Sequence, residues 1–187
     1  MLPADRAARG GRRLRRAASS LLMLSLWPGG CASAPPAAAK APAPAAPVSE
    51  GPAPFYEFTA LDGSKISSDA SLGRNTVIVF ITSYGGSSQA QARFLSGVAH
   101  DHVPRTNCYA IFTERLDNRP LIEMFVELLK LRLPVAHVEY ADLKGGPFAG
   151  VIAVPTVIIL DRGGRIAWRK DALATQDEID KVLRRLE

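Results

Sequence analysis

Two adjacent serines, Ser87 and Ser88, lie where a hydrophobic run turns into a run of helix-forming residues, in the stretch FITSYGGSSQAQARFL (80–95). A strand that turns sharply into a helix often places a reactive group at the helix N-terminus. A serine hydroxyl becomes a nucleophile only beside a general base, and this stretch contains no histidine, acid or cysteine. It also lacks the G-x-S-x-G pattern of a nucleophile elbow. Gly85 and Gly86 instead leave main-chain N–H groups free to bind an anion or a peptide carbonyl.

The second cysteine and the three histidines offer other chemistry. Cys108 begins an apolar run, which favours a buried, inert thiol; the alternative is a single-thiol peroxidase or mixed-disulfide site. His100 and His102 form an H-x-H pair, but two imidazoles without nearby cysteine or carboxylate ligands make a poor metal site. We expect both to interact with a helix end or with solvent, and His137 to be structural. The sequence therefore predicts no metal and no cofactor.

The first 30 residues have the pattern of an export signal. Six arginines precede an apolar stretch from Ala17 to Trp27, and small residues follow it. The apolar stretch has about a dozen residues, which is shorter than the ~20 that a membrane-spanning helix needs. We therefore predict a signal peptide at 1–30 and an exported protein.

Cys31 has more than one interpretation. Gly29-Gly30-Cys31 resembles the end of a bacterial lipobox, whose cysteine is lipidated after cleavage, although Pro28 stands where such boxes usually carry leucine. The alternatives are a cut after Ala32-Ser33-Ala34, which a proline follows directly, and an incidental cysteine. We favour lipidation of Cys31, which predicts a periplasm-facing or cell-surface lipoprotein of a bacterium, with the membrane as a partner through a lipid anchor. Several acyl chains on one cysteine supply the stable anchoring that a single chain does not, and Cys108 is then left without a disulfide partner.

The charge balance argues against a nucleic-acid partner. The formal net charge of +5 arises wholly from the signal peptide, which carries six arginines and one aspartate. The rest of the chain has 17 basic and 17 acidic residues, so its balance gives no basic footprint for a polyanion. We expect no nucleic acid to bind.

The remaining chain divides into a tether and one domain. Residues 31–54 consist largely of alanine and proline without apolar periodicity, which predicts a semi-extended tether. The segment 55–187 has globular composition and is long enough for one core. Its expected elements are a hairpin turning at Asp62-Gly63, strands at 76–82, 108–113 and 154–161, helices at 87–101 and 118–133, a short strand or extended segment at 135–142, a returning strand at 165–170, and a closing helix with a capping box from Thr175 to Glu178.

Local patterns also predict how these elements begin and pack. Ser87 or Ser88 is placed to cap the first long helix. The apolar positions of the helix at 118–133 are expected to make one stripe: Leu121, Ile122, Phe125, Leu128, Leu129 and Leu133. The βαβ order implies a parallel central sheet, and the late hairpin implies an antiparallel edge. We assign no function to Tyr140 or Trp168.

In this order the segments resemble the membrane-tethered thioredoxin-like proteins of bacteria, the TlpA/ResA type within the thioredoxin and AhpC/TSA superfamily. The resemblance covers roughly residues 53–187. The stretch APFYEFTALDGSKIS…SLGRNTVIVFI is similar to that group's N-terminal hairpin and first core strand, VPTVIILDRGGRIAWR to its cis-proline strand and hairpin, and ALATQDEIDKVLRRL to its last helix. The resemblance implies an α/β, thioredoxin-like fold: a central mixed sheet flanked by helices, with an N-terminal β-hairpin extension and Pro155 as the cis-proline.

The resemblance also shows what is missing. The family's Trp-Cys-x-x-Cys redox motif falls on Tyr84, Gly85, Gly86, Ser87 and Ser88, so Gly85 takes the place of the nucleophilic cysteine and Ser88 that of the resolving one. An alternative peroxiredoxin alignment, Thr-x-x-Cys, also ends on Gly85. In the family the helix N-terminus lowers a cysteine pKa so that a thiolate exists at neutral pH. A serine is far too weak an acid for the same help.

These observations predict a binding or scaffold module with no catalytic residue. In the family, the backbone beside the cis-proline pairs with an extended substrate peptide, which makes Val154, Pro155 and Thr156 the candidate peptide-binding residues here. The expected partner is an envelope protein or an extended peptide. The alternative is a thiol-dependent oxidoreductase or peroxidase that uses Cys108 alone.

Overall fold

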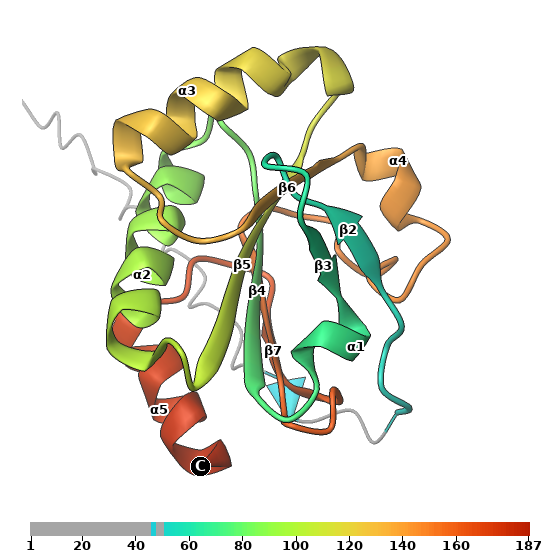
Figure 1. Cartoon of the computed structure of the whole chain (residues 1–187), viewed down its shortest axis with the longest axis vertical. Coiled ribbons are helices and arrows are strands. Elements are labelled where there is room, and N and C mark those ends of the chain that lie inside the picture. The colour runs from blue at the N-terminus through green and yellow to red at the C-terminus, as the bar shows by residue number, and fades with distance from the viewer. Residues whose placement is uncertain (1–45, 48–50) are drawn as a thin grey trace, which may run out of the picture. The chain divides into compact units, whose positions relative to one another are not determined.

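The computed structural model describes residues 46–47 and 51–187 (Figure 1). The predicted signal peptide, Cys31 and most of the predicted tether lie outside these residues. The elements are β1 (Ala46–Pro47), β2 (Glu57–Thr59), β3 (Lys65–Ser67), α1 (Ser68–Ser71), β4 (Asn75–Ile81), α2 (Gly86–His102), β5 (Thr106–Thr113), η1 (Leu116–Asn118), α3 (Arg119–Leu129), β6 (Val135–Val138), α4 (Tyr140–Leu143), β7 (Thr156–Leu160), β8 (Ile166–Lys170) and α5 (Gln176–Leu186). No helix of the described residues is long and apolar enough to cross a membrane.

The main sheet is mixed, as the sequence predicts. Its strand order is β1-β8-β7-β4-β5-β6, with β4, β5 and β6 parallel and β7 and β8 antiparallel. Strand β4 is buried along its whole length, which explains its continuous run of apolar and β-branched residues. The predicted hairpin at Asp62-Gly63 is confirmed as β2–β3, a separate two-stranded sheet.

Helices and hairpin cover opposite faces of this sheet (Figure 1). Helices α2, α3 and α5 pack their apolar side chains on one face, in a cluster that includes Leu95, Ile122 and Ile179. The hairpin and the segment before β7 pack on the other face around Phe80 and Phe148. The predicted fold class, a central mixed sheet flanked by helices, is confirmed.

The position of α2 is fixed by polar contacts with α5 and the segment before it. The side chain of Gln91 donates to the carbonyl of Ala174 at 3.1 Å and accepts from its N–H at 2.7 Å, in the interior. Near the other end of α2, His102 Nε2 lies 3.1 Å from Asp180 Oδ1. Helix α5 itself begins with the predicted capping box between Thr175 and Glu178. These contacts hold α2 against α5 and the segment before α5.

Helix α3 corrects two predictions about the segment 118–133. The helix ends at Leu129, because Lys130 adopts a left-handed conformation with φ 51°. Its apolar residues form two faces in place of one stripe: Ile122 and Phe125 are buried, whereas Leu121 and Leu128 are 47% and 70% exposed. A helix that lies on one face of a sheet buries only the side that faces the sheet. The second apolar face borders the site described below.

Candidate functional site

The turn at residues 82–85 joins the buried end of β4 to the start of α2. Gly85 is the N-cap of α2, and no side chain of the described residues caps the helix. The prediction that Ser87 or Ser88 caps it is therefore wrong. Uncapped N–H groups of a first helical turn are free to donate to a bound acceptor, and Gly86 and Ser87 are exposed there.

Ser88 holds the turn together. Its side chain is buried, and its Oγ accepts a hydrogen bond from the main-chain N–H of Thr82 at 3.2 Å, with the Thr82 hydroxyl 3.4 Å away. A hydroxyl that is buried and satisfied inside the protein cannot reach a substrate. The Ser88 side chain is thus structural.

The backbone of the turn has the spacing of a disulfide between positions 85 and 88. A Cβ atom built on Gly85 would lie 3.7 Å from the Cβ of Ser88, and Cβ atoms joined by a disulfide are about 3.5–4.5 Å apart. Its nearest neighbours would be Ser88 Oγ at 3.3 Å and Thr82 Oγ1 at 3.4 Å. The two positions can therefore accept a disulfide, although neither carries a cysteine.

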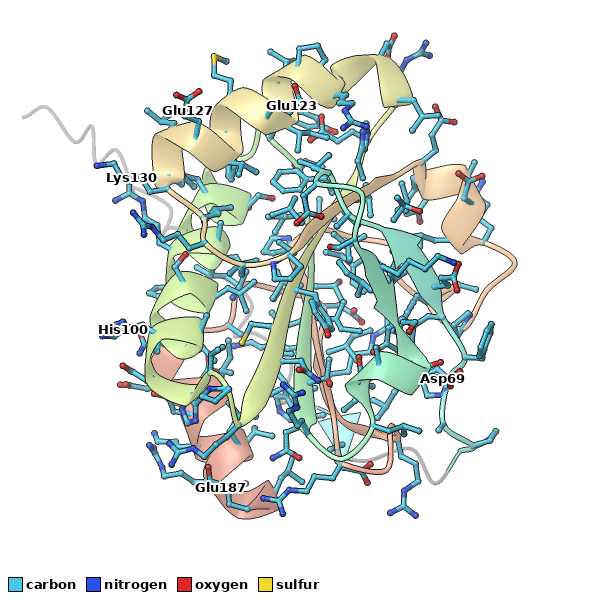
Figure 2. All side chains as sticks on the ribbon, in the orientation of Figure 1. Asp69, His100, Glu123, Glu127, Lys130 and Glu187 are labelled. Atoms are coloured by element: carbon cyan, nitrogen blue, oxygen red, sulfur yellow. The ribbon has the colours of Figure 1, made fainter. Side chains whose placement is uncertain are left out.

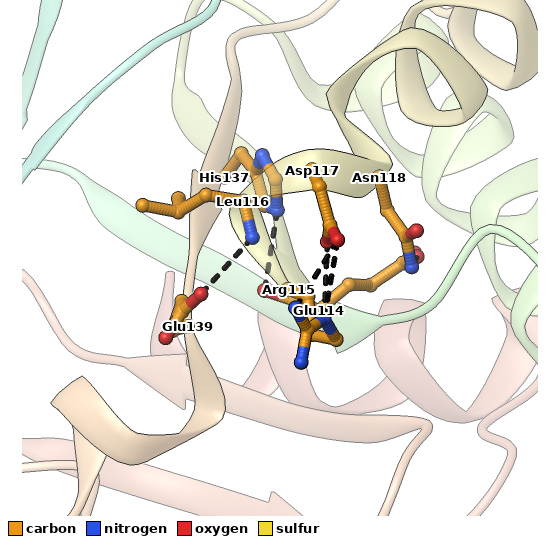
Figure 3. A network of polar contacts seen from close by, with 7 residues as sticks. All are labelled: Glu114, Arg115, Leu116, Asp117, Asn118, His137 and Glu139. Carbon is orange, nitrogen blue, oxygen red and sulfur yellow. Dashed lines mark hydrogen bonds and ion pairs between the residues drawn. The ribbon is translucent and has the colours of Figure 1, made fainter.

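A buried carboxylate, which the sequence analysis missed, anchors the turn from the neighbouring strand. Glu114 directly follows β5 and is 4% exposed. Its carboxylate accepts from the main-chain N–H of Ser83, from the Ser83 hydroxyl at 3.0 Å and from Asn118 Nδ2 at 3.0 Å. The Nε2–H of His137 donates to the main-chain carbonyl of Glu114 at 3.2 Å, within the network of Figure 3. The structural role predicted for His137 is consistent with this contact.

An apolar cleft of about 280 Å³ lies between the turn and α3. Tyr84 forms one wall and is 74% exposed; Leu121, Met124 and Leu128 form the other and are 47%, 59% and 70% exposed. The rest of the lining consists of Ser83, Gln89, Phe125 and the two glycines, Gly85 and Gly86. Exposed apolar side chains gathered around a cleft mark an interaction surface.

The predicted peptide-binding residues lie at the start of β7. The Val154–Pro155 peptide bond is cis, and the pairing of Thr156 with Phe80 places Pro155 beside the last residue of β4. Pro155 and Thr156 are buried, and the Thr156 hydroxyl is already bound to Ala153 O and Asp171 Oδ1. Among the described residues, the main-chain groups of Val154 have no hydrogen-bond partner. Of these three residues Val154 is the least buried, and its main-chain groups are the ones best placed to meet a peptide.

Cys108 lies away from the turn. It pairs with Val77 in the sheet, four positions before the end of β4, a separation of about 13 Å at ~3.3 Å per residue. The thiol is buried, and desolvation raises its pKa to about 12. Almost no thiolate exists at neutral pH, which opposes nucleophilic chemistry at this residue.

The histidine pair is separated by the structure. His102 is buried against Asp180, whereas His100 is exposed on α2. Within residues 51–187, no group of three histidine, cysteine or acidic side chains is arranged to hold a metal ion. Tyr140 begins α4 with Lys144 above its ring, and Trp168 packs at the edge of the core.

Comparison with solved structures places the fold. A DsbF homologue from Corynebacterium diphtheriae matches with a TM-score of 0.63 and 16% identity over 76% of this chain and 88% of its own. StoA from Bacillus subtilis matches with a TM-score of 0.59 and 19% identity, over 70% and 96% of the two chains. A secreted disulfide oxidoreductase of Mycobacterium tuberculosis matches with a TM-score of 0.60 and 20% identity, also over 70% and 96%. No family model and no curated protein matches the sequence. The structural neighbours are thiol–disulfide oxidoreductases, and the chain has their thioredoxin-like fold.

Proposed function

We propose that this chain is an exported thioredoxin-fold module that has lost thiol–disulfide chemistry and binds an extended segment of another protein in the bacterial cell envelope. One observation carries the proposal. The turn has the Cβ spacing of a disulfide, Gly85 and Ser88 stand where the family resemblance places the two cysteines, and the Ser88 hydroxyl is bound internally. A site of this shape without a thiol can hold a partner and cannot exchange disulfides with it.

The surroundings of the turn support binding of an extended segment. The cleft offers apolar side chains of α3, the start of α2 offers uncapped N–H groups, and Val154 offers main-chain groups with no partner among the described residues. An extended peptide needs this combination, because main-chain hydrogen bonds supply affinity and pockets for its side chains supply specificity. The partner segment is therefore expected to carry apolar side chains.

The location in the envelope rests on the N-terminal sequence. The proposed signal peptide at 1–30, lipidation of Cys31 and the alanine/proline tether would hold the domain at a membrane surface. Incorporation of labelled palmitate into the wild-type chain but not into the Cys31→Ser variant would support the anchor. Labelling of both, or of neither, would contradict it.

The loss of redox chemistry is tested with the purified full chain. Disulfide reduction and peroxide consumption are measured for the Cys31→Ser variant, in which Cys108 is the remaining thiol, and for the variant that also carries Cys108→Ser. We expect neither protein to exceed the background rate. Activity that is present in the first and absent from the second would replace our proposal with a single-thiol enzyme.

Binding at the cleft is tested by photo-crosslinking in cells of the native host. A photoreactive amino acid at Leu128 is expected to give a specific adduct, because this side chain borders the cleft and is 70% exposed. The same amino acid at Leu72, which is 54% exposed and does not line the cleft, serves as the matched control. Met124→Asp should abolish the Leu128 adduct by placing a charge in the cleft. An adduct that survives this substitution, or that forms equally from Leu72, would contradict binding at the cleft.

A further inference from the structure

A second cavity lies near the start of β5, at the opposite end of that strand from the turn. Its volume is about 440 Å³, within the ~300–1,000 Å³ usual for small-molecule sites. Strand β5 begins at Thr106, but its pairing with β6 begins only at Ala110. The first four residues of β5 therefore have no strand beside them on that edge in the described structure, and the cavity occupies this place between α2 and the connection from α3 to β6.

The interior of the cavity is largely apolar. Ala99 and Val103 of the α2 end, Cys108 of β5 and Leu133 of the connection line it. Ser96 lines it as well, and the buried Ser96 hydroxyl has no hydrogen-bond partner among the described residues. A buried hydroxyl without a partner is costly and rare in native structures. Because the Ser96 oxygen is itself inaccessible to solvent, it lies behind the cavity surface, and the side chains that a ligand would meet in the interior are the apolar ones.

The rim of the cavity is positively charged. Arg74, Lys130 and Arg132 line it together with His100, and no acidic residue does. Within residues 51–187, none of the three permanent cations takes part in an ion pair. Figure 2 shows His100 on α2 and Lys130 at the end of α3 on the same side of the molecule. An apolar interior with a rim of unpaired cations is complementary to an anion that carries an apolar body.

We propose that this cavity binds a small amphiphilic anion, with its apolar body against Ala99, Cys108 and Leu133 and its carboxylate or phosphate head group at Lys130 and Arg132. This site is separate from the cleft beside the turn and does not depend on the function proposed there. Cys108 contributes apolar surface here and no thiol chemistry.

Binding is measured by titration calorimetry on the full chain with decanoate and decyl phosphate below their micellar concentrations. The two anions distinguish a carboxylate head group from a phosphate one. Decanol and inorganic phosphate are the matched controls, because each keeps only half of the ligand's chemistry. At least one of the two anionic amphiphiles should bind with an affinity at least about tenfold higher than that of either control. Charged hydrogen bonds and apolar burial contribute together to its binding, whereas each control has only one of them. Equal binding of decanol, or no binding of either anion, would overturn the proposal.

Two pairs of substitutions locate the head group. The double substitution Lys130→Gln with Arg132→Gln should lower the affinity for the anion about tenfold, because two charge-assisted contacts are lost. Lys181→Gln with Arg184→Gln removes the same charge from exposed positions on α5 and should change affinity by less than about twofold. Equal losses from the two pairs would show a general charge effect and overturn the assignment. Amide chemical shifts of Ser96 and Cys108 should move on titration, and shifts confined to Gly85 and Gly86 would place the ligand at the turn instead.

Discussion

The carboxylate of Glu114 binds both the main-chain N–H and the hydroxyl of Ser83, although the two residues are 31 positions apart. The contact joins the end of β5 to the turn that follows β4. These strands are parallel, with Ile81 opposite Phe112, so their carboxyl ends lie side by side. A buried acceptor beside the turn fixes Ser83 and thereby orients Tyr84, which forms one wall of the apolar cleft.

Glu114→Ala is expected to lower the free energy of unfolding by about 1–3 kcal/mol, because the part-buried N–H and hydroxyl of Ser83 would lose their acceptor. Asp117→Asn is the control: among the described residues this exposed carboxylate bonds only the exposed Arg115, and its loss should leave the stability nearly unchanged, because exposed ion pairs contribute little. Urea denaturation of the two variants measures the difference. Equal stabilities would show that the contact does not hold the turn. Photo-crosslinking from Leu128 should also weaken in Glu114→Ala if the turn forms the cleft wall.

His102→Ala is expected to destabilise the protein by about 1–3 kcal/mol, because it leaves the buried carboxylate of Asp180 without its partner. His100→Ala, two residues earlier on the exposed side of α2, should change stability by less than about 0.5 kcal/mol. Thermal or urea unfolding of both variants tests the contrast. Similar values for the two histidines would mean that the α2–α5 contact depends on packing alone.

Much of the fold was predictable because the signals are local. Strand β4 is a continuous run of apolar and β-branched residues, the hairpin turns at Asp62-Gly63, and α5 begins with Thr175 three residues before Glu178. Each pattern depends on neighbouring residues, so the sequence shows it directly. The placement of the family's two cysteine positions on Gly85 and Ser88 depends only on the spacing of an ungapped motif, and it stays a prediction.

The remaining features depend on contacts between distant segments. In the sequence Glu114 is an acidic residue after a strand, with no motif around it. Only the parallel pairing of β4 with β5 brings its side chain next to Ser83. The exposure of Leu121 and Leu128 follows from which side of α3 faces the sheet. Helical periodicity alone does not contain this information, so the sequence analysis assigned both residues to the same stripe as the buried ones. The burial of His102 is likewise set by α5, which lies 78 residues away at Asp180.

Stability at alkaline pH is expected to depend on Cys108. Burial raises its pKa from 9.0 to about 12, so above pH 9 the unfolded chain releases a proton that the folded chain retains. The stabilisation is fully present below pH 9 and is lost as the pH rises toward 12. When the pH rises from 8 to 10, the free energy of unfolding of the wild type should fall by about 1 kcal/mol more than that of Cys108→Ala. Urea denaturation at the two pH values measures this difference, and identical losses would show that the thiol is solvated.

Two cysteines placed at positions 85 and 88 should give the turn thiol–disulfide chemistry. In a chain that carries Cys31→Ser and Cys108→Ser, the substitutions Gly85→Cys and Ser88→Cys are expected to form a disulfide, because the Cβ separation of 3.7 Å fits one. The N-terminus of α2 should lower the pKa of the first thiol below its ordinary value, so that it attacks a disulfide at neutral pH.

The matched control for this double variant is Gly85→Cys with Ser87→Cys. It has the same composition, but position 87 is exposed whereas Ser88 is buried beside Gly85. Thiol titration and insulin reduction compare the two proteins, and only the 85/88 pair should oxidise within the chain and reduce insulin. If the 85/88 pair oxidises and stays inactive, the turn keeps the geometry of a disulfide site without its reactivity. If it does not oxidise, the backbone is not that of a redox site, and the proposal of a lost thiol–disulfide activity fails with it.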